Sequence, residues 1–327
     1  MECIQSTSQV AAGNELAQMP LIPGLPDDIA LSCLARLPRK FHTVLKCVSK
    51  RWRDLVCSDE WYSYRRKHKL DEAWIYALCR DKQERSFCYV LDPNSSQRCW
   101  KHIQGIPPQI SKRKGMGFET LGKKIYFLGG CGWVEEPTDE VYCYDVSANT
   151  WNETTSLSIA RYMHKWLISH VDPNLVPDIE DSVVLDGQIY IRCGGSSLLS
   201  HVYAIVYEPS RGSWQHVDAD IASGWKGPAV VIDGTLYVLD QSSGLRLMKW
   251  QKESKDWVVV KRLSQLLTQP PCRLVAIGKR LFVIGKGLST LVFDVDQSEN
   301  AGRIMVGSSI SKLTSDYDVI SCKVVAL

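Results

Sequence analysis

The apolar positions along this chain follow two different periods. Between residues 40 and 55 they recur every three or four positions, which predicts one face of an amphipathic helix; these positions are Phe41, Val44, Leu45, Val48, Trp52 and Leu55. An earlier helix is predicted to begin near Pro26, because Asp27 and Asp28 place carboxylates at the positive end of the helix dipole, and Pro38 is expected to stop it. From about residue 73 short β-rich runs separated by Gly, Asp, Asn and Pro replace this period. The pattern therefore predicts a small helical part followed by a large β part.

The helical part is too small for its apolar content. Two or three helices of about 40 residues in total lie near the lower limit for an independent core. Some of the apolar side chains should therefore be covered by something else, and two explanations stay open. The helices either dock on the domain that follows, or they bind a partner protein.

The β part contains an internal repeat. Four segments consist of a strand, a tight glycine turn and a second strand, and the turn glycines Gly122, Gly187, Gly234 and Gly278 are 65, 47 and 44 residues apart. Such spacings are typical of propeller blades. A third strand then ends in an aromatic–acidic pair such as Tyr144-Asp145, and a fourth strand carries Trp151, Trp214 or Trp257. We expect these tryptophans, with Tyr126, Tyr190 and Tyr237, to pack between blades.

The two ends of the β part predict how the ring closes. Residues 73–103 contain three candidate strands but no leading strand, whereas residues 322–327 resemble the leading strand at 272–277. We therefore expect the C-terminal strand to complete the first blade, which removes two exposed sheet edges. This gives five blades, or six if residues 161–180 fold as more than a loop.

Composition and charge reduce the number of function classes to which the chain could belong. The chain has 327 residues and a net charge of +3, which gives no strong attraction to nucleic acid or to a membrane. No secretory segment precedes the twelve cysteines, so we expect them to be reduced, and without a Cys-x-x-Cys pair they do not indicate a zinc site. No apolar run is long enough to span a bilayer.

The helical part resembles a known family. Leu25-Pro26-Asp27-Asp28-Ile29, Leu37-Pro38 and Val48-Ser49-Lys50-Arg51-Trp52-Arg53 resemble the F-box, which inserts into the Skp adaptor of SCF-type ubiquitin ligases. The resemblance implies a Skp-family adaptor as partner and, through it, cullin and RING subunits. The adaptor contacts that it implies are Leu25, Pro26, Ile29, Leu34, Leu37, Pro38, Leu45, Val48 and Trp52. A tryptophan at position 52 could instead hold the helices together.

The repeat resembles the kelch motif, and the chain from about Pro20 to Leu327 resembles plant F-box proteins with kelch repeats. We thus expect an α+β multidomain protein with a disordered tail (1–18), a helical F-box (19–62), a linker (63–72) and an all-β kelch-type propeller (73–327). The resemblance implies the substrate-recognition subunit of an SCF ubiquitin ligase, in the nucleus, the cytoplasm or both. Two alternatives are an F-box scaffold without a role in ubiquitination and a propeller that senses a small molecule.

Catalysis by the propeller itself is not expected. The kelch propeller is similar to the fold of galactose oxidase, whose copper site needs histidine and tyrosine ligands. None of the seven histidines forms a spaced ligand pair, and no acid, base and nucleophile share a motif. We expect no enzyme activity, no cofactor and no metal.

A target would be recognised by loops at one end of the ring. Aromatic residues outside the repeat register, with charged neighbours, are the candidates, and we expect target contacts from Trp133, Glu135, Arg161, His164, Trp225 and Lys226. Packing of these aromatic rings back onto the loops is the alternative. The basic run from Arg65 to Lys69 indicates either a nuclear-import signal or the solvated face of a helix.

Overall fold

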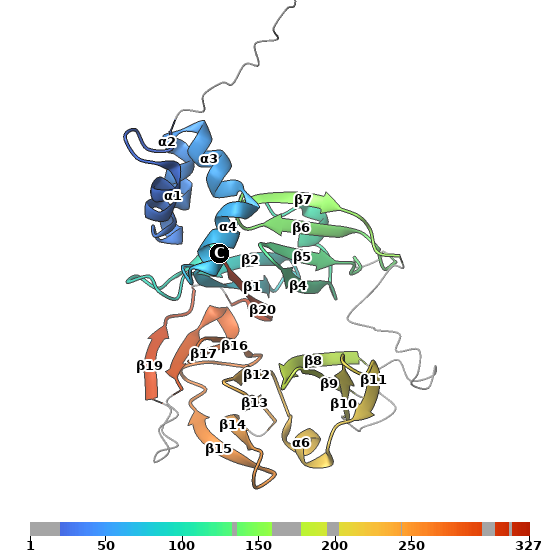
Figure 1. The fold of residues 1–327 in the computed structure, drawn as a ribbon. Coiled ribbons are helices and arrows are strands. Elements are labelled where there is room, and N and C mark those ends of the chain that lie inside the picture. The colour runs from blue at the N-terminus through green and yellow to red at the C-terminus, as the bar shows by residue number, and fades with distance from the viewer. Residues whose placement is uncertain are drawn as a thin grey trace, which may run out of the picture. The chain divides into compact units, whose positions relative to one another are not determined.

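The computed structural model describes residues 20–132, 136–158, 178–194, 203–242, 244–295, 305–313 and 316–327 (Figure 1). The chain divides into two compact units, residues 1–72 and 73–327. The first unit is helical and the second consists of β-sheets.

The helical unit contains short helices instead of two long ones. They are α1 (Asp27–Ala35), the 3-10 helix η1 (Arg39–Phe41), α2 (His42–Val48), α3 (Lys50–Cys57) and α4 (Asp59–Lys67). The expected start of the first helix is confirmed, but α1 ends three residues before Pro38. The prediction of one continuous helix over residues 40–55 is wrong.

Serine residues begin new helices in this unit, and Ser49 breaks the predicted helix. Ser49 has an extended backbone, and its Oγ accepts a hydrogen bond of 3.1 Å from the amide of Trp52, which starts α3. Ser58 caps α4 in the same way through the amide of Trp61, also at 3.1 Å. A serine side chain at this position satisfies an amide that has no partner within the helix, so the polar residue starts a new helix although the apolar spacing continues across it.

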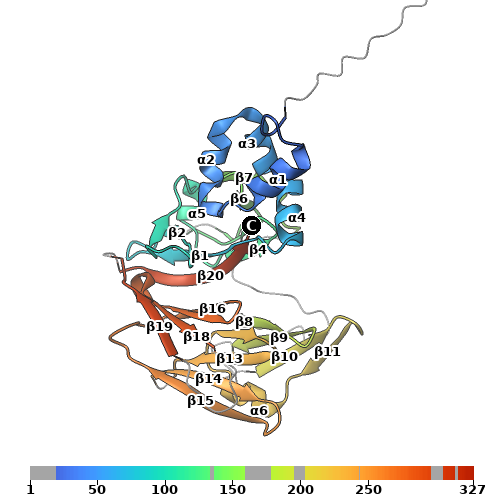
Figure 2. The ribbon, with the colours of Figure 1, turned by 60° about the vertical axis from the view of Figure 1, so that its left-hand side comes forward.

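The second unit contains five four-stranded antiparallel sheets, which form a five-bladed β-propeller (Figures 1 and 2). From the inner to the outer strand, the first blade consists of β20 (Asp318–Ala326), β1 (Ala73–Arg80), β2 (Ser86–Leu91) and β3 (Trp100–His102), and the second of β4 (Gly117–Leu121), β5 (Lys124–Leu128), β6 (Val141–Asp145) and β7 (Thr150–Thr154). The third blade consists of β8 (Asp178–Leu185), β9 (Gln188–Gly194), β10 (Tyr203–Glu208) and β11 (Ser213–His216), and the fourth of β12 (Ala229–Ile232), β13 (Thr235–Asp240), β14 (Leu245–Gln251) and β15 (Asp256–Leu263). The fifth blade consists of β16 (Arg273–Ile277), β17 (Arg280–Ile284), β18 (Thr290–Asp294) and β19 (Met305–Ile310). The connections that the structure describes contain three short helices: α5 (Pro108–Ser111), α6 (Ala219–Gly224) and η2 (Lys286–Leu288).

The repeated glycines form the turn between the first two strands of four blades. Gly187 and Gly234 have φ angles of 75° and 72°, and the preceding residues Asp186 and Asp233 are also left-handed, at 52° and 47°. Two successive positive φ angles define the turn that matches the twist of an antiparallel hairpin. Glycine adopts this conformation without a Cβ clash, and aspartate tolerates it.

The C-terminal strand belongs to the first blade. β20 pairs antiparallel with β1 along its length, with Ala73 opposite Ala326 and Ala77 opposite Cys322. Val319 and Val325 of β20 are buried. The predicted five-bladed fold is therefore confirmed, and the pairing joins the last strand of the chain to the first strand of the propeller.

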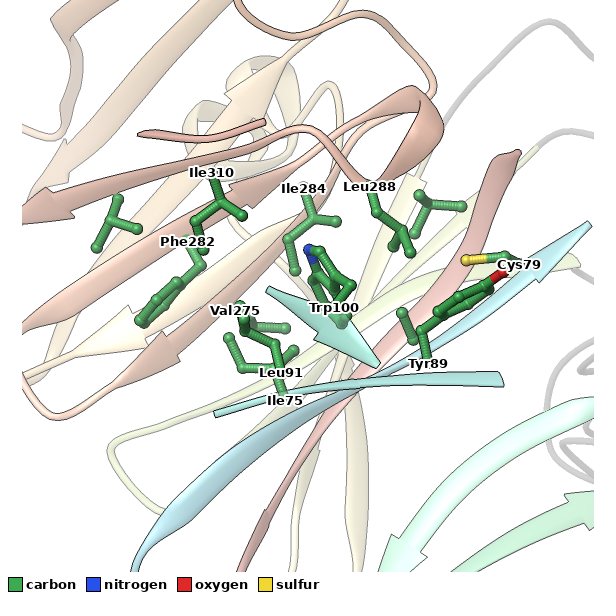
Figure 3. Packing of buried hydrophobic residues seen from close by; sticks show 13 residues of the cluster. Ile75, Cys79, Tyr89, Leu91, Trp100, Val275, Phe282, Ile284, Leu288 and Ile310 are labelled. Atoms are coloured by element: carbon green, nitrogen blue, oxygen red, sulfur yellow. The ribbon is translucent and has the colours of Figure 1, made fainter. Parts of the chain in front are cut away.

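Apolar clusters join adjacent blades. Figure 3 shows the cluster between the first and the fifth blade, in which Ile75 and Leu91 pack with Phe282 and Ile284. The indole Nε1 of Trp100 in this cluster donates a hydrogen bond of 3.1 Å to Oγ1 of Thr290. Packing of this kind fixes each blade against its neighbour.

The outer-strand tryptophans stack on aromatic neighbours within their blades. Trp151 lies on Tyr144, Trp214 on Tyr207 and Trp257 on Trp250, with ring centroids 4.9, 4.7 and 5.4 Å apart. Such distances are typical of stabilising aromatic pairs. These tryptophans contribute to packing, but these aromatic partners lie within the same blade, whereas the repeat predicted packing between blades.

Candidate functional site

Large apolar side chains are exposed on the first helices of the N-terminal unit. We name the set the F-face; it contains Leu25, Ile29, Phe41, Val44 and Val48. Leu25 and Ile29 lie at the start of α1, whereas the other three lie on η1 and α2 at steps of three and four residues, so they share one side of that segment. Val44 and Val48 are 60% and 58% exposed, which is unusual for valines in a unit this small.

The predicted adaptor contacts divide into exposed and buried residues. Leu25, Pro26, Ile29, Pro38 and Val48 are exposed, and Leu37 is half-buried. Leu34 and Leu45 are each 5% exposed, because they point into the core of the unit. Their prediction as adaptor contacts is corrected: their side chains support the F-face from inside.

Two exposed residues were missing from the predicted contacts. Phe41 and Val44 are part of the apolar period along residues 40–55, but the resemblance to the F-box motif did not include them. The signal that could have identified them is their spacing from Val48, since residues at i, i+3 and i+7 lie on one helix face. The break at Ser49 separates this group from Leu55.

Trp52 is half-buried and ties the N-terminal segment to α3. Its indole Nε1 donates a hydrogen bond of 2.7 Å to the carbonyl oxygen of Leu21. Asp27 of α1 pairs with Arg51 of α3, and its carboxylate also accepts the amide of Leu21 at 2.8 Å. The hydrogen bond from Leu21 and the Arg51 guanidinium lower the pKa of Asp27. The contacts support the alternative in which Trp52 holds the helices together.

A buried arginine fixes the connection between α1 and α2. The Arg65 side chain is 1% exposed and donates to the carbonyl oxygens of Ala35, Leu37 and Leu70, the last two at 2.9 and 2.6 Å. It also pairs with Glu72 at 3.3 Å. Because a guanidinium presents several donors in a fixed plane, one side chain holds several backbone carbonyls at once.

This arginine belongs to the basic run that was considered as a solvated face or an import signal. Arg66, Lys67, His68 and Lys69 are exposed, but Arg65 is not. The interpretation as a solvated helix face therefore holds for these four residues and is corrected at Arg65, whose role is structural; a role in nuclear import stays a prediction. The Leu37-Pro38 turn owes its position to this contact.

His42 supports α2 from inside the unit. Its ring lies edge-on to that of Trp61, with centroids 5.5 Å apart. Burial, together with the charges of Arg65 and Arg39, lowers the pKa of His42 to about 3. The imidazole is therefore neutral at physiological pH.

The predicted target contacts in the propeller have different outcomes. Trp225 is completely buried, so its prediction as a target contact is corrected, whereas Lys226 is exposed. Trp133, Glu135, Arg161 and His164 lie outside the described residues. The alternative of inward packing holds for Trp225, whose indole packs in the cluster between the third and fourth blades.

The described residues offer little chemistry beyond binding. Within the described ranges no three His, Cys, Asp or Glu side chains gather as a metal site would require. The described cysteines are free, and burial raises the pKa of Cys322 to about 12, which keeps that thiol protonated. Among the described helices, none has the length and apolar character needed to cross a membrane.

Comparison with known proteins places the chain in a family. Residues 22–64 match the F-box domain and residues 112–158 match the Kelch motif. The chain is 46% identical over its full length to the F-box/kelch-repeat protein SKIP4 of Arabidopsis thaliana, and the match covers all of that relative too. This chain is an F-box/kelch-repeat protein.

More distant relatives show the same combination of domains. The Arabidopsis F-box/kelch-repeat protein SKIP30 is 22% identical, with 93% of this chain and 94% of the relative covered. The F-box/kelch-repeat protein At1g67480 of the same plant is 27% identical, with 81% of this chain and 67% of the relative covered. The F-face of this F-box/kelch-repeat protein lies within the region that matches the F-box.

Proposed function

We propose that this F-box/kelch-repeat protein is a substrate receptor of an SCF ubiquitin ligase. The F-face binds a Skp-family adaptor, the adaptor links the chain to cullin and RING subunits, and the propeller holds a target protein. The observation that carries the proposal is the F-face itself. A unit of about 50 residues that leaves this much apolar surface in water gains stability when a partner covers it.

The chain positions the target protein and performs no step of the ligation reaction itself. Other subunits and a ubiquitin-charged E2 enzyme perform the ligation, while the receptor holds the target lysine near the donor. Tethering raises the effective concentration of the reacting groups, so no acid, base or nucleophile is needed in this chain. The chain is accordingly a non-catalytic subunit.

The test is binding of the full chain to a purified plant Skp adaptor, measured by co-purification and calorimetry. Ile29→Asp and Val44→Asp place charges on the F-face and should each weaken binding about tenfold or more, because a buried unpaired carboxylate costs several kcal/mol. Ser63→Asp adds the same charge at an exposed position of α4 and is the matched control.

Binding of the wild type and the control, with loss in both F-face variants, supports the receptor role. Equal binding by all four proteins would reject the F-face as the adaptor site. Co-purification of a cullin and faster turnover of a bound target separate a ligase receptor from a scaffold. Thermal stabilisation of the propeller by a small molecule would instead favour a ligand sensor.

A further inference from the structure

Two arginines face each other across the outer strands of the fourth blade, formed by β12–β15 (orange in Figure 1). Arg246 of β14 and Arg262 of β15 are direct partners in the antiparallel ladder. Side chains at such positions have Cβ atoms only about 5 Å apart, and like charges directly opposite destabilise a sheet. The pair therefore requires an explanation beyond the stability of the blade.

The charge of only one of these arginines is neutralised within the blade. Arg246 pairs with Asp240, which is almost completely buried. Burial acts to raise the pKa of Asp240, but hydrogen bonds from Ser242 and Arg246 lower it below its usual value, so the carboxylate is ionised. Arg262 is exposed and forms no ion pair with any residue in the described ranges. The positive charge of Arg262 is therefore not neutralised by a described residue at this edge of the blade.

The two arginines line a hollow of about 210 Å³. Its other lining residues are Gly244, Leu245 and Leu263. The hollow thus combines two guanidinium groups with aliphatic walls. A carboxylate matches this arrangement, because the planar fork of an arginine guanidinium binds both carboxylate oxygens together.

The segment that follows β15 exposes two leucines in an ordered turn. Leu266 is 95% exposed and Leu267 is 55% exposed. Ser264 organises the turn: its Oγ accepts the amide of Leu266 at 3.2 Å, and its carbonyl oxygen accepts the amides of Leu267 and Thr268 at 3.1 and 3.3 Å. The apolar side chains are therefore exposed by a defined backbone.

Hydrogen bonds to neighbouring segments of the propeller fix both the hollow and the turn that carries Leu266 and Leu267. Gln241, next to Asp240, donates to the carbonyl of Cys272 at 3.2 Å and accepts its amide at 3.0 Å. Thr268 is 1% exposed and accepts a hydrogen bond from Ser289 at 3.3 Å. Lys286 donates its amide to the carbonyl of Gln269 at 2.8 Å. A surface held in this way loses little conformational entropy on binding.

We propose that the hollow at Arg246 and Arg262, with Leu266 and Leu267, forms a docking surface for an acidic and apolar peptide segment of a partner protein. A carboxylate of the segment binds the arginines and an apolar side chain packs on the leucines. Leu266 lies four positions after Arg262, so their Cα atoms are at most about 14 Å apart, a span that about four extended peptide residues cover. The identification of this partner as the ligase target rests on the proposed function. The existence of the docking surface does not rest on it.

The experiment selects 12-residue peptides from a displayed random library on the purified full chain, with counter-selection on an Arg262→Glu, Leu266→Ser double variant. We expect enriched peptides to carry Asp or Glu within about four residues of Leu, Ile or Phe. A synthetic enriched peptide is then titrated by fluorescence anisotropy. Arg262→Glu should weaken its binding about tenfold or more, Arg262→Gln less, and Leu266→Ser several-fold.

Two matched variants control for charge and exposure elsewhere on the propeller. Arg211→Glu changes an arginine side chain that is 72% exposed, and Leu121→Ser changes a leucine that is 73% exposed. Both should bind the peptide within about twofold of the wild type, a difference below 0.5 kcal/mol. Circular dichroism and melting temperature verify that each variant is folded.

Three selection results would overturn the proposal. They are that no peptide is enriched, that the enriched peptides lack acidic residues, or that they bind the Arg262→Glu variant as well as the wild type. Preferential binding of a single-stranded oligonucleotide over the acidic peptide also overturns it. Adaptor binding is measured on the same variants. A chain that binds the peptide but no adaptor rejects the ligase role and keeps this surface, whereas the reverse result rejects only the surface.

Discussion

The indole Nε1 of Trp225 donates a hydrogen bond of 3.3 Å to Oδ2 of Asp181. The amide of Ala229 donates to the same oxygen at 2.7 Å. Asp181 belongs to β8, whereas Ala229 begins β12, so one carboxylate joins the third blade to the fourth. Burial raises the pKa of Asp181 to about 6, although these hydrogen bonds and the charge of Arg192 act to lower it.

The junction predicts a pH dependence of stability. Because the folded state holds the Asp181 proton more tightly than the unfolded state, the contribution is present below about pH 4 and is lost as pH rises to about 6. We expect a decrease of about 2 kcal/mol across this window from this group. Asp181→Asn keeps an acceptor oxygen but does not titrate, so it should remove this part of the slope in urea unfolding followed by near-ultraviolet circular dichroism.

The matched control for this prediction is Asp294→Asn, which changes an exposed aspartate on β18. It should leave the slope between pH 4 and 6 as in the wild type. If Asp181→Asn and the wild type have parallel pH profiles, the buried carboxylate does not titrate as described.

Arg65→Met should destabilise the helical unit by about 3 to 5 kcal/mol, because the carbonyls of Ala35, Leu37 and Leu70 lose a buried charged donor. Hydrogen–deuterium exchange of peptides from residues 20–72 measures this loss separately from the propeller. Arg66→Met, at the exposed neighbouring position, should change exchange by no more than about 0.5 kcal/mol. Equal protection in the two variants would contradict the structural role of Arg65.

The neighbours Val44 and Leu45 should respond in opposite ways to substitution by alanine. Leu45→Ala removes a buried side chain and should lower the stability of the helical unit by about 2 to 4 kcal/mol. Val44→Ala should leave exchange nearly unchanged and weaken adaptor binding. A Val44→Ala protein as unstable as Leu45→Ala would show that Val44 is part of the core and not of the F-face.

Removal of β20 should destabilise the whole propeller. A chain that ends at residue 317 leaves β1 without its inner neighbour and exposes the apolar residues that Val319 and Val325 cover. Calorimetry should show a melting temperature at least about 10 °C lower, or no cooperative transition. Removal of residues 1–18 is the control. A truncated protein that melts like the full chain would contradict closure by β20.

The propeller was predictable because its signals are local. Four blades repeat a hairpin turn whose glycine is favoured by a positive φ angle, and such a turn needs only neighbouring residues. The likeness of Cys322-Lys323-Val324 to the leading strand at Cys272 indicated how the ring closes. The sequence left five or six blades open, depending on residues 161–180, and the structure has five.

Exposure within the candidate sites could not be predicted in this way. Val44 and Leu45 belong to one apolar period, yet Val44 is exposed and Leu45 is buried, because the packing of the short helices decides which side chain faces solvent. The burial of Trp225 depends on Asp181, 44 positions earlier in the chain. Contacts between distant residues leave no periodic signal in one sequence.

The pairing of β20 with β1 also has a consequence for synthesis of the protein. A ribosome releases the F-box first, but the blade that starts at Ala73 lacks its inner strand until the last ten residues have emerged. A nascent or prematurely terminated chain therefore carries the F-box together with an unclosed ring. Under the proposed function, such fragments would occupy adaptors without delivering a target, so synthesis of β20 would be a condition for a productive receptor.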